Sequence, residues 1–165
     1  MPAAMDETLL DPLLDSWDRN NRVLVNLLRT IPEDSLGIRA TNESPSVAAL
    51  FMHIHYVRLV FISEDAPDFA QTAPAQEWAA EPDRGRMAEM LDMSAQTVRE
   101  AVKSKVEARQ EMNLHYDHPI LLLQHMIWHE GYHHGQIKLA LKIAGCPLDD
   151  AVIGPLSWRG WMQKK

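Results

Sequence analysis

The chain has 165 residues, of which 46% are hydrophobic and 24% are charged, and its formal net charge is -7. These proportions are ordinary for a soluble globular protein, and a chain of this length can bury a sizeable core. We therefore expect a single domain over residues 1–165. The negative charge argues against a general nucleic-acid-binding protein, which needs a basic surface to neutralise phosphates.

The sequence contains one cysteine, Cys146, so an intrachain disulfide framework and a cysteine-rich zinc site are both excluded. No uninterrupted apolar run approaches the roughly 20 residues that a helix needs to span a bilayer. The opening segment MPAAMDETLL lacks the basic region and apolar stretch of a signal peptide. We expect a cytoplasmic protein with no membrane partner.

The first helical pattern runs from about Asp6 to Thr30, where leucines recur at spacings of three and four residues. Pro12 follows Asp11, which favours a regular helix that starts here, with Asp11 as N-cap and Pro12 as the first helical residue. The Ile31-Pro32 pair is expected to end this helix.

The second predicted helix begins near Ser44-Pro45-Ser46 and runs to about Glu64, with Ser44 as N-cap and Pro45 as its first residue. The segment 66–82 contains three prolines and no periodicity, so we expect a loop in which residues 75–80 can form a short helical turn. Loops of this length often act as lids or binding elements.

The third predicted helix covers residues 83–108, and the fourth follows Pro119 and ends at Gly145. The tail from 148 to 165 contains Trp158 and Trp161, and we expect it to pack back on the helices as a turn or short helix. Four long helices with one long connection predict an all-α, four-helix bundle.

His129 and His133 are four residues apart within the fourth predicted helix, so they lie on one helix face. At about 100° per residue, this face lies opposite the polar side that Gln124, Lys138 and Lys142 mark. Both histidines therefore point towards the core. Two imidazoles at this spacing can bind one metal ion.

His53 lies on the apolar face of the second predicted helix, next to Val57, whereas His55 falls towards Arg58 at the other margin. His53 is therefore the partner that helix geometry selects. Three inward histidines are costly to bury unless each finds a partner, and a metal ion satisfies all three together. The alternative is that all three are hydrogen-bonded core residues without a metal. The remaining histidines His115, His118 and His125 are interpreted as surface or cap residues.

Two segments carry a more specific pattern. They read His129-x-x-x-His133-x-Gly135-Gln136, followed by Ile137, and Ser46-Val47-x-x-Leu50-x-x-His53. Together they resemble the DinB/YfiT-like superfamily, the damage-inducible-type four-helix bundles, and the resemblance covers nearly the whole chain.

This resemblance implies a three-histidine site for a divalent metal, usually zinc or nickel, with His53, His129 and His133 as the ligands. His134 stands where many members have arginine. Several characterised relatives use low-molecular-weight thiols, among them bacillithiol transferases, mycothiol-dependent transferases and maleylpyruvate isomerases. Homodimers are common in the family, so we expect a homodimer here.

Three functions remain open from the sequence. The first is a metal-dependent, thiol S-transferase-like enzyme on a small-molecule substrate, because three protein ligands leave coordination positions free. The second is a small-substrate hydrolase, because His129-Glu130-x-x-His133 matches the H-E-x-x-H pattern in which glutamate is the general base. Glu130 is the candidate catalytic residue, although it flanks the histidine face. The third is a non-enzymatic metal-binding bundle or dimeric sensor. Specificity is expected in the loop 66–82 and in the tail with Trp158 and Trp161.

Overall fold

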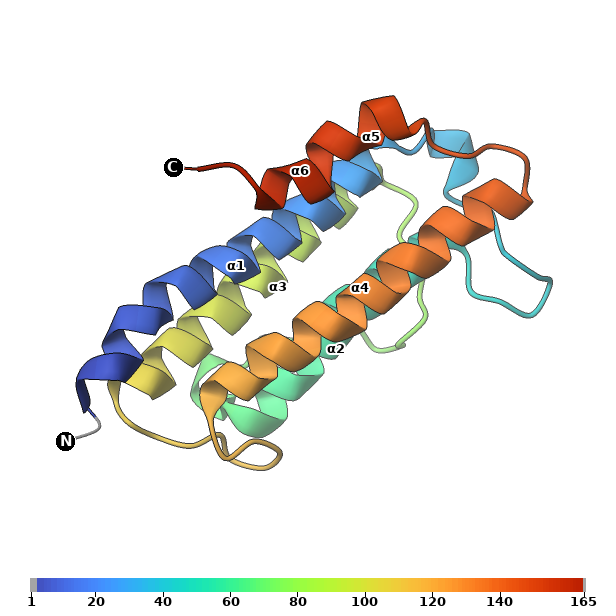
Figure 1. Cartoon of the computed structure of the whole chain (residues 1–165). Helices are drawn as coiled ribbons and strands as arrows, with labels where there is room; N and C mark the ends of the chain where they lie inside the picture. Colours follow the sequence, from blue (N-terminus) through green and yellow to red (C-terminus); the bar gives the residue numbers. More distant parts are fainter. Residues whose placement is uncertain (1–2, 165) are drawn as a thin grey trace.

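The computed structural model describes residues 3–164, and 69% of the chain is helical. No β-strand is found among these residues; one isolated bridge pairs Arg39 with Ser46. Four long helices form a bundle in which α4 lies in front of α2, and α1 lies beside α3 (Figure 1). The predicted all-α, four-helix bundle is therefore confirmed. The elements are α1 (Ala3–Thr30), the 3₁₀ turn η1 (Glu33–Ser35), α2 (Val47–Asp65), the 3₁₀ turn η2 (Pro67–Phe69), α3 (Arg84–Glu107), α4 (Pro119–Ile143), α5 (Asp150–Leu156) and α6 (Trp158–Trp161).

The start of α1 differs from the prediction. The helix continues through Pro12, so the expected start with Asp11 as N-cap is wrong. The proline ring has a helical φ, and it removes one backbone hydrogen bond, to the carbonyl of Thr8. Leu10 and Leu14 are buried on either side of Pro12. Their burial compensates for the lost bond and keeps the helix regular.

The cap of α2 is also displaced from the predicted Ser44. Ser46 is the N-cap, and its hydroxyl accepts a hydrogen bond from the Ala49 N–H at 3.2 Å. The first amides of the helix, those of residues 47 and 48, donate to the carbonyls of Ile38 and Leu36. These bonds tie the segment 36–46 to the helix start and satisfy donors that would otherwise lack partners.

The other helix ends agree with the predicted signals. The Asp83 carboxylate caps α3 by accepting from Arg86 N–H at 2.9 Å, and the His118 ring caps α4. Gly145 follows α4 with φ of 81°, the left-handed conformation that favours glycine. Helices α5 and α6 pack back along α1 (Figure 1), where the Arg19 guanidinium donates to three tail carbonyls at 2.9–3.0 Å.

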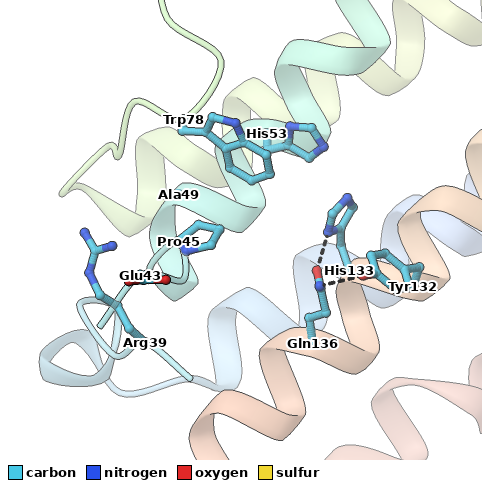
Figure 2. Close-up of a pocket in the computed structure, with 9 residues that line it drawn as sticks. All are labelled: Arg39, Glu43, Pro45, Ala49, His53, Trp78, Tyr132, His133 and Gln136. Atoms are coloured by element: carbon cyan, nitrogen blue, oxygen red, sulfur yellow. Dashed lines mark hydrogen bonds between the residues drawn. The ribbon is translucent and has the colours of Figure 1, made fainter. Parts of the chain in front are cut away.

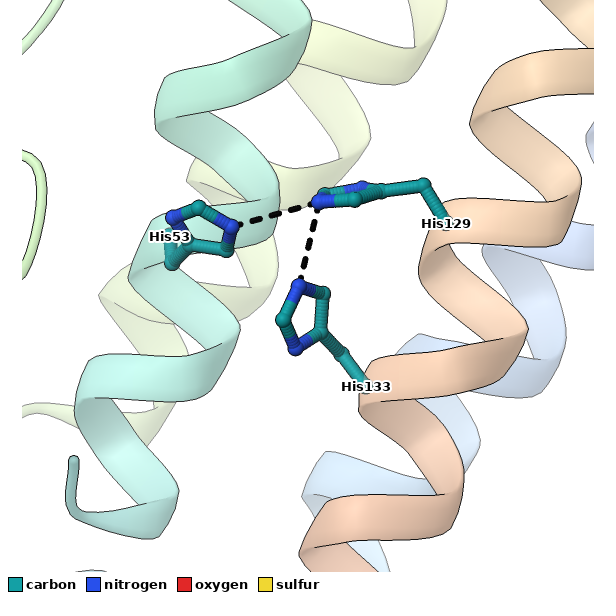
Figure 3. Close-up of side chains that lie close together, drawn as sticks. All are labelled: His53, His129 and His133. Atoms are coloured by element: carbon teal, nitrogen blue, oxygen red, sulfur yellow. Dashed lines mark hydrogen bonds between the residues drawn. The ribbon is translucent and has the colours of Figure 1, made fainter. Parts of the chain in front are cut away.

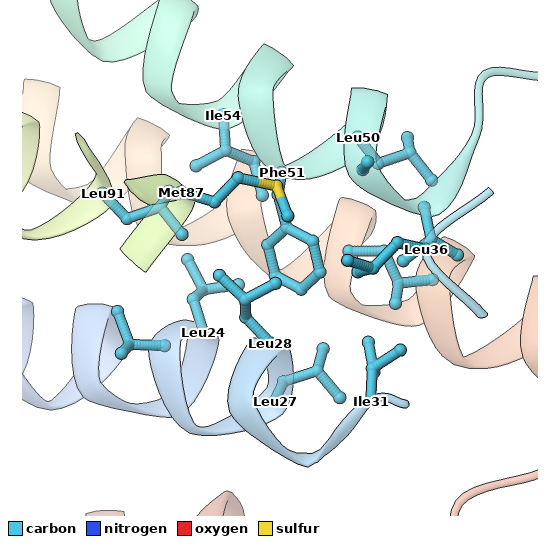
Figure 4. Close-up of a cluster of buried hydrophobic side chains, with 14 of the residues drawn as sticks. Leu24, Leu27, Leu28, Ile31, Leu36, Leu50, Phe51, Ile54, Met87 and Leu91 are labelled. Carbon is cyan, nitrogen blue, oxygen red and sulfur yellow. The ribbon is translucent and has the colours of Figure 1, made fainter. Parts of the chain in front are cut away.

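The core consists of two apolar clusters along the bundle. One is centred on Phe51 and Leu28 (Figure 4), and the other surrounds Trp17 and Met126. On every long helix, buried polar residues stand between the two clusters in the sequence: they are Asn20, Asn21, Arg58, Ser94 and Glu130. The bundle therefore contains a polar layer at mid-length.

Helix α2 is long and apolar enough in composition to span a membrane. In the bundle, 67% of its most apolar window is buried against the other helices. This burial is what the central helix of a packed core requires.

Candidate metal centre

The structure brings the three predicted histidines together between α2 and α4. The Nε2 atom of His129 lies 3.2 Å from Nε2 of His53 and 3.0 Å from Nε2 of His133 (Figure 3). One ring nitrogen of each residue lies within 4.8 Å of those of the other two. The i, i+4 spacing on α4 supplies two rings, and α2 supplies the third from the facing helix.

Neighbouring side chains orient two of the rings. His133 Nδ1 lies 2.7 Å from Gln136 Oε1, and the Gln136 amide donates to Tyr132 OH at 3.0 Å. This pairing places the His133 proton on Nδ1 and leaves the Nε2 lone pair facing the cluster. The Trp78 ring stacks on His53 at 4.0 Å, and Glu77 Oε1 lies 3.1 Å from His53 Nδ1, without hydrogen-bond geometry.

The three histidine rings cannot satisfy their hydrogen-bonding capacity through one another alone. With the His133 proton on Nδ1, a single proton on His129 Nε2 would have to serve both neighbouring Nε2 atoms. The Nδ1 atoms of His53 and His129 are buried without a hydrogen-bond partner. Since a divalent cation can accept three Nε2 lone pairs at once, the residues present fit a metal ion better than a hydrogen-bonded core.

Burial also places the rings in the protonation state that a metal needs. Together with the nearby His133, which has the smaller effect, it lowers the pKa of His53 and of His129 to about 4. Burial lowers the pKa of His133 as well, although Gln136 and Glu130 oppose the shift. All three rings are therefore neutral at pH 7, and neutral imidazole is the ligand form.

These shifts predict a pH dependence of the metal-free protein. In the unfolded chain the histidines bind protons near pH 6.5, whereas folded His53 and His129 do so only near pH 4. The unfolded state thus binds more protons between these values, so the free energy of unfolding falls as the pH drops from about 6.5 to about 4. Urea unfolding in chelator, at pH values across this window, measures the slope. A His53→Gln/His129→Gln variant should have a shallower slope, and equal slopes would contradict the assignment.

A cavity of about 600 Å³ opens beside the histidines. Figure 2 shows His53 and His133 in its wall, with Trp78 from the loop 66–82 beside the His53 ring. This loop was predicted as a lid or binding element, and it supplies part of the cavity wall. Residues 77–78 form a turn within the segment 75–80, where a short helical turn was considered possible. The nine lining residues are Arg39, Glu43, Pro45, Ala49, His53, Trp78, Tyr132, His133 and Gln136.

Glu130 lies away from this cavity, in the polar layer of the bundle. Its side chain is fully buried, and its two carboxylate oxygens accept from Arg58 Nε at 2.6 Å and Nη2 at 2.8 Å. Asn20 donates a further hydrogen bond to Oε2. The carboxylate is thus fully engaged, which corrects the expectation that the H-E-x-x-H spacing supplies a general base.

His115, His118 and His125 have structural partners. His118 caps α4 as expected, His115 lies 2.8 Å from the buried Asp65 carboxylate, and His125 contacts Tyr116 OH at 2.7 Å. His55, like His53, is buried, but it stays outside the metal cluster.

The sequence reasoning missed several contributors to the site. Glu77 and Trp78 lie in a segment without periodicity, so no sequence signal marked them. Gln136 was part of the quoted motif, which could have identified it as the residue that orients His133. His134 was noted only as standing where many family members have arginine, and its Nε2 atom is buried.

Comparison with known proteins agrees with this fold. No curated protein matches the chain. A crystal structure of a DinB-like protein from Bacillus cereus ATCC 10987 is similar in fold, with a TM-score of 0.66 and 16% sequence identity, over 84% of this chain and 96% of that chain. The sequence model of the DinB family matches residues 5–149. The chain therefore belongs to the DinB family.

Proposed function

We propose that this protein is a metal-dependent enzyme of the thiol S-transferase type that acts on a small molecule. His53, His129 and His133 would hold the divalent ion, and zinc or nickel is the proposed metal because imidazole suits both. The observation that carries the proposal is the convergence of three Nε2 atoms at the wall of a 600 Å³ cavity. Membership of the DinB family is compatible with metal binding.

Three protein ligands are the number found in catalytic sites, whereas structural sites are closed by a fourth. A bound divalent ion would lower the pKa of a thiol that reaches it and so supply a thiolate nucleophile at neutral pH. A small-molecule substrate is supported by the cavity volume, which lies within the range of about 300–1,000 Å³ for ligand pockets.

The chain's own residues would bind and orient the substrate. Trp78 and Tyr132 offer flat aromatic surfaces on two sides of the cavity, and Arg39 and Glu43 bring one charge of each sign to its wall. Gln136 holds His133 in a fixed orientation. The loop with Trp78 covers His53 and keeps solvent from that side of the cluster.

The test is metal-dependent thiol consumption. Zinc- or nickel-loaded protein is incubated with a panel of low-molecular-weight thiols and 1-chloro-2,4-dinitrobenzene. The new S–C bond replaces the C–Cl bond, chloride leaves and the thiol proton goes to buffer. We expect a rate that falls at least 100-fold in His129→Ala, while Met93→Ala, at an exposed position on α3, keeps it. No metal-dependent rate with any thiol would overturn the transferase proposal.

The hydrolase alternative loses its general base, because both oxygens of Glu130 are held by Arg58 and Asn20 outside the cavity. We do not propose it as a second function. The non-enzymatic alternative, in which the metal is structural, predicts instead that the protein unfolds when the metal is removed.

A homodimer is the proposed assembly. Helix α4 carries an exposed apolar row whose members are four and seven residues apart and so share one face. An exposed apolar row of this kind marks a contact surface. The row consists of Leu121, Trp128, Tyr132, Leu139 and Ile143.

The dimer proposal predicts that Trp128→Glu yields a monomer. Trp128 is 71% exposed at the centre of the row, so a buried charge there would oppose association. Light scattering after size exclusion should give twice the 18.8 kDa chain mass for the wild type and for the control Met93→Glu. A wild-type monomer would contradict the proposal.

A further inference from the structure

The cavity beside the histidines has a charged end. Arg39 and Glu43 are the one arginine and the one carboxylate among its nine lining residues, and both come from the segment that precedes α2. Figure 2 shows them on the opposite side of the cavity from Tyr132. Trp158 and Trp161, where specificity was also expected, lie outside this cavity. Selection of a substrate by its charge therefore falls to Arg39 and Glu43.

The turn that contains Glu43 holds both side chains in place. The Ser44 amide donates to the Thr41 carbonyl at 3.1 Å, and the hydroxyl groups of these two residues lie 2.8 Å apart. Arg39 Nη1 donates to the Ser44 carbonyl at 2.6 Å. The guanidinium therefore lies against the residue that follows Glu43, and the two opposite charges are neighbours on the cavity wall.

Neither charge is used within the protein. The Arg39 guanidinium has several N–H donors, and among the residues that the structure describes its one partner is the Ser44 carbonyl. The Glu43 carboxylate has no hydrogen bond or ion pair with any residue in the described part of the chain, Arg39 included. A cation and an anion that lie side by side without pairing are both available to a ligand.

An α-amino acid group matches this pair of charges. It carries an ammonium and a carboxylate on one carbon atom, so its carboxylate can accept from Arg39 while its ammonium donates to Glu43. A simple anion would be repelled by Glu43, and a simple cation would be repelled by Arg39. The charged end therefore favours a zwitterionic head group over either of them.

The charged end lies about two helical turns from the histidines. Ala49 lies one turn before His53 on α2, and Pro45 stands four residues before Ala49, ahead of the helix start. With a pitch of about 5.4 Å, two turns span about 10 Å. Cysteine is too short to hold its amino acid group at Arg39 and its thiol near His53, because one extended residue spans only about 3.5 Å. A thiol fits if a spacer of about two residues separates the two groups.

We propose that the thiol substrate is a short peptide thiol with a free α-amino acid head group, as in a γ-glutamyl thiol. The head-group carboxylate binds Arg39, and the head-group ammonium binds Glu43. The spacer lies along the cavity between Trp78 and Tyr132, and the thiol lies at the histidine end. This inference rests on the transferase function proposed above and adds the class of thiol.

A series of four thiols tests the head group. Glutathione carries both of its charges, glutaryl-cysteinylglycine keeps the carboxylate, 4-aminobutyryl-cysteinylglycine keeps the ammonium, and butyryl-cysteinylglycine has neither. Binding to nickel-loaded protein is measured from the charge-transfer absorption that a nickel-bound thiolate adds. We expect glutathione to bind about tenfold more tightly than either thiol with one head-group charge. Equal affinities of all four thiols would overturn the inference.

Two variants assign the two charges. Glu43→Gln should weaken glutathione and the aminobutyryl thiol about tenfold and leave the glutaryl thiol within about twofold. Arg39→Gln should weaken glutathione and the glutaryl thiol and spare the aminobutyryl thiol. Glu89→Gln and Arg29→Gln are the matched controls, because they make the same changes of charge at exposed positions outside this cavity. Equal weakening of all four thiols, as a loosened turn would cause, or no change in either variant would overturn the assignment.

The head group is also tested without metal. S-methylglutathione has no free thiol, and its binding to metal-free protein is followed through the Trp78 side-chain N–H signal in a ¹H–¹⁵N spectrum, assigned with Trp78→Phe. A saturable shift that Glu43→Gln weakens would support the head-group site even if no thiol bound the nickel, a result that would end the transferase proposal alone. No saturable shift, or nickel-bound thiols without head-group selectivity, would overturn this inference and leave the transferase proposal standing.

Discussion

Replacing Glu130 with alanine is expected to lower the free energy of unfolding by about 3–5 kcal/mol, the usual cost of removing one partner of a buried ion pair. The change leaves the fully buried Arg58 guanidinium without its carboxylate. Urea unfolding of metal-free protein measures the loss. Glu89→Ala on α3 is the control, because Glu89 is exposed and should change stability by less than about 0.5 kcal/mol.

The size of this effect follows from how completely Arg58 is enclosed. Besides Glu130, its guanidinium donates to Asn21 Oδ1 at 2.9 Å and to the Leu91 carbonyl at 2.8 Å, and it lies 4.9 Å from the centre of the Trp17 ring. These contacts join all four long helices at the polar layer.

A double replacement separates burial of charge from packing. Arg58→Met/Glu130→Met removes both charges and keeps much of the volume, so it should recover most of the stability lost in Glu130→Ala. A separate variant, Glu130→Gln, tests whether Glu130 has a role in metal binding. Since the carboxylate positions helices and does not face the cavity, Glu130→Gln should keep one bound metal per chain where it is folded. A loss below about 1 kcal/mol in Glu130→Ala would show that the pair is not formed.

The second large effect concerns the metal. Protein stripped by a chelator should stay folded, and free metal at about 1,000 times its Kd should then raise the free energy of unfolding by about 4 kcal/mol. The fold survives because the two apolar clusters on either side of the polar layer form without the metal. Circular dichroism and urea unfolding, with and without metal, measure both quantities.

His53→Ala is the matched variant for this experiment. It should fold like the metal-free wild type and gain no stability from zinc or nickel. The outcome also decides between an open and a closed site. A metal-free protein that is unfolded would indicate a structural metal, as proposed in the non-enzymatic alternative, because binding energy is then folding energy.

The periodicity of the sequence was sufficient to predict the four long helices, because each buries apolar residues that recur at spacings of three and four. The helix starts at Pro12 and Ser44 were predicted wrongly for a shared reason. Cap rules describe local preferences, whereas the burial of Leu10 and Leu14 and the bonds from α2 to the segment 36–46 are tertiary.

The candidate metal site was likewise only partly predictable from local sequence patterns. The i, i+4 rule and the apolar face of α2 were sufficient to bring His53, His129 and His133 together. They could not reveal that Trp78 stacks on His53, since the loop 66–82 has no periodicity, or that Arg58 pairs with Glu130 across two helices. Contacts of this kind depend on how the helices are placed, which local spacing does not encode.

The central claim is that the three histidines form one metal site, and metal content per chain tests it most directly. Untagged wild-type protein, His53→Ala and His129→Ala are each equilibrated with zinc or nickel, desalted and analysed for metal and for helix content. We expect one equivalent in the wild type and none in either variant, with the helical signal retained in all three. A wild type that holds no metal after either addition would contradict the account and leave the three histidines as core residues.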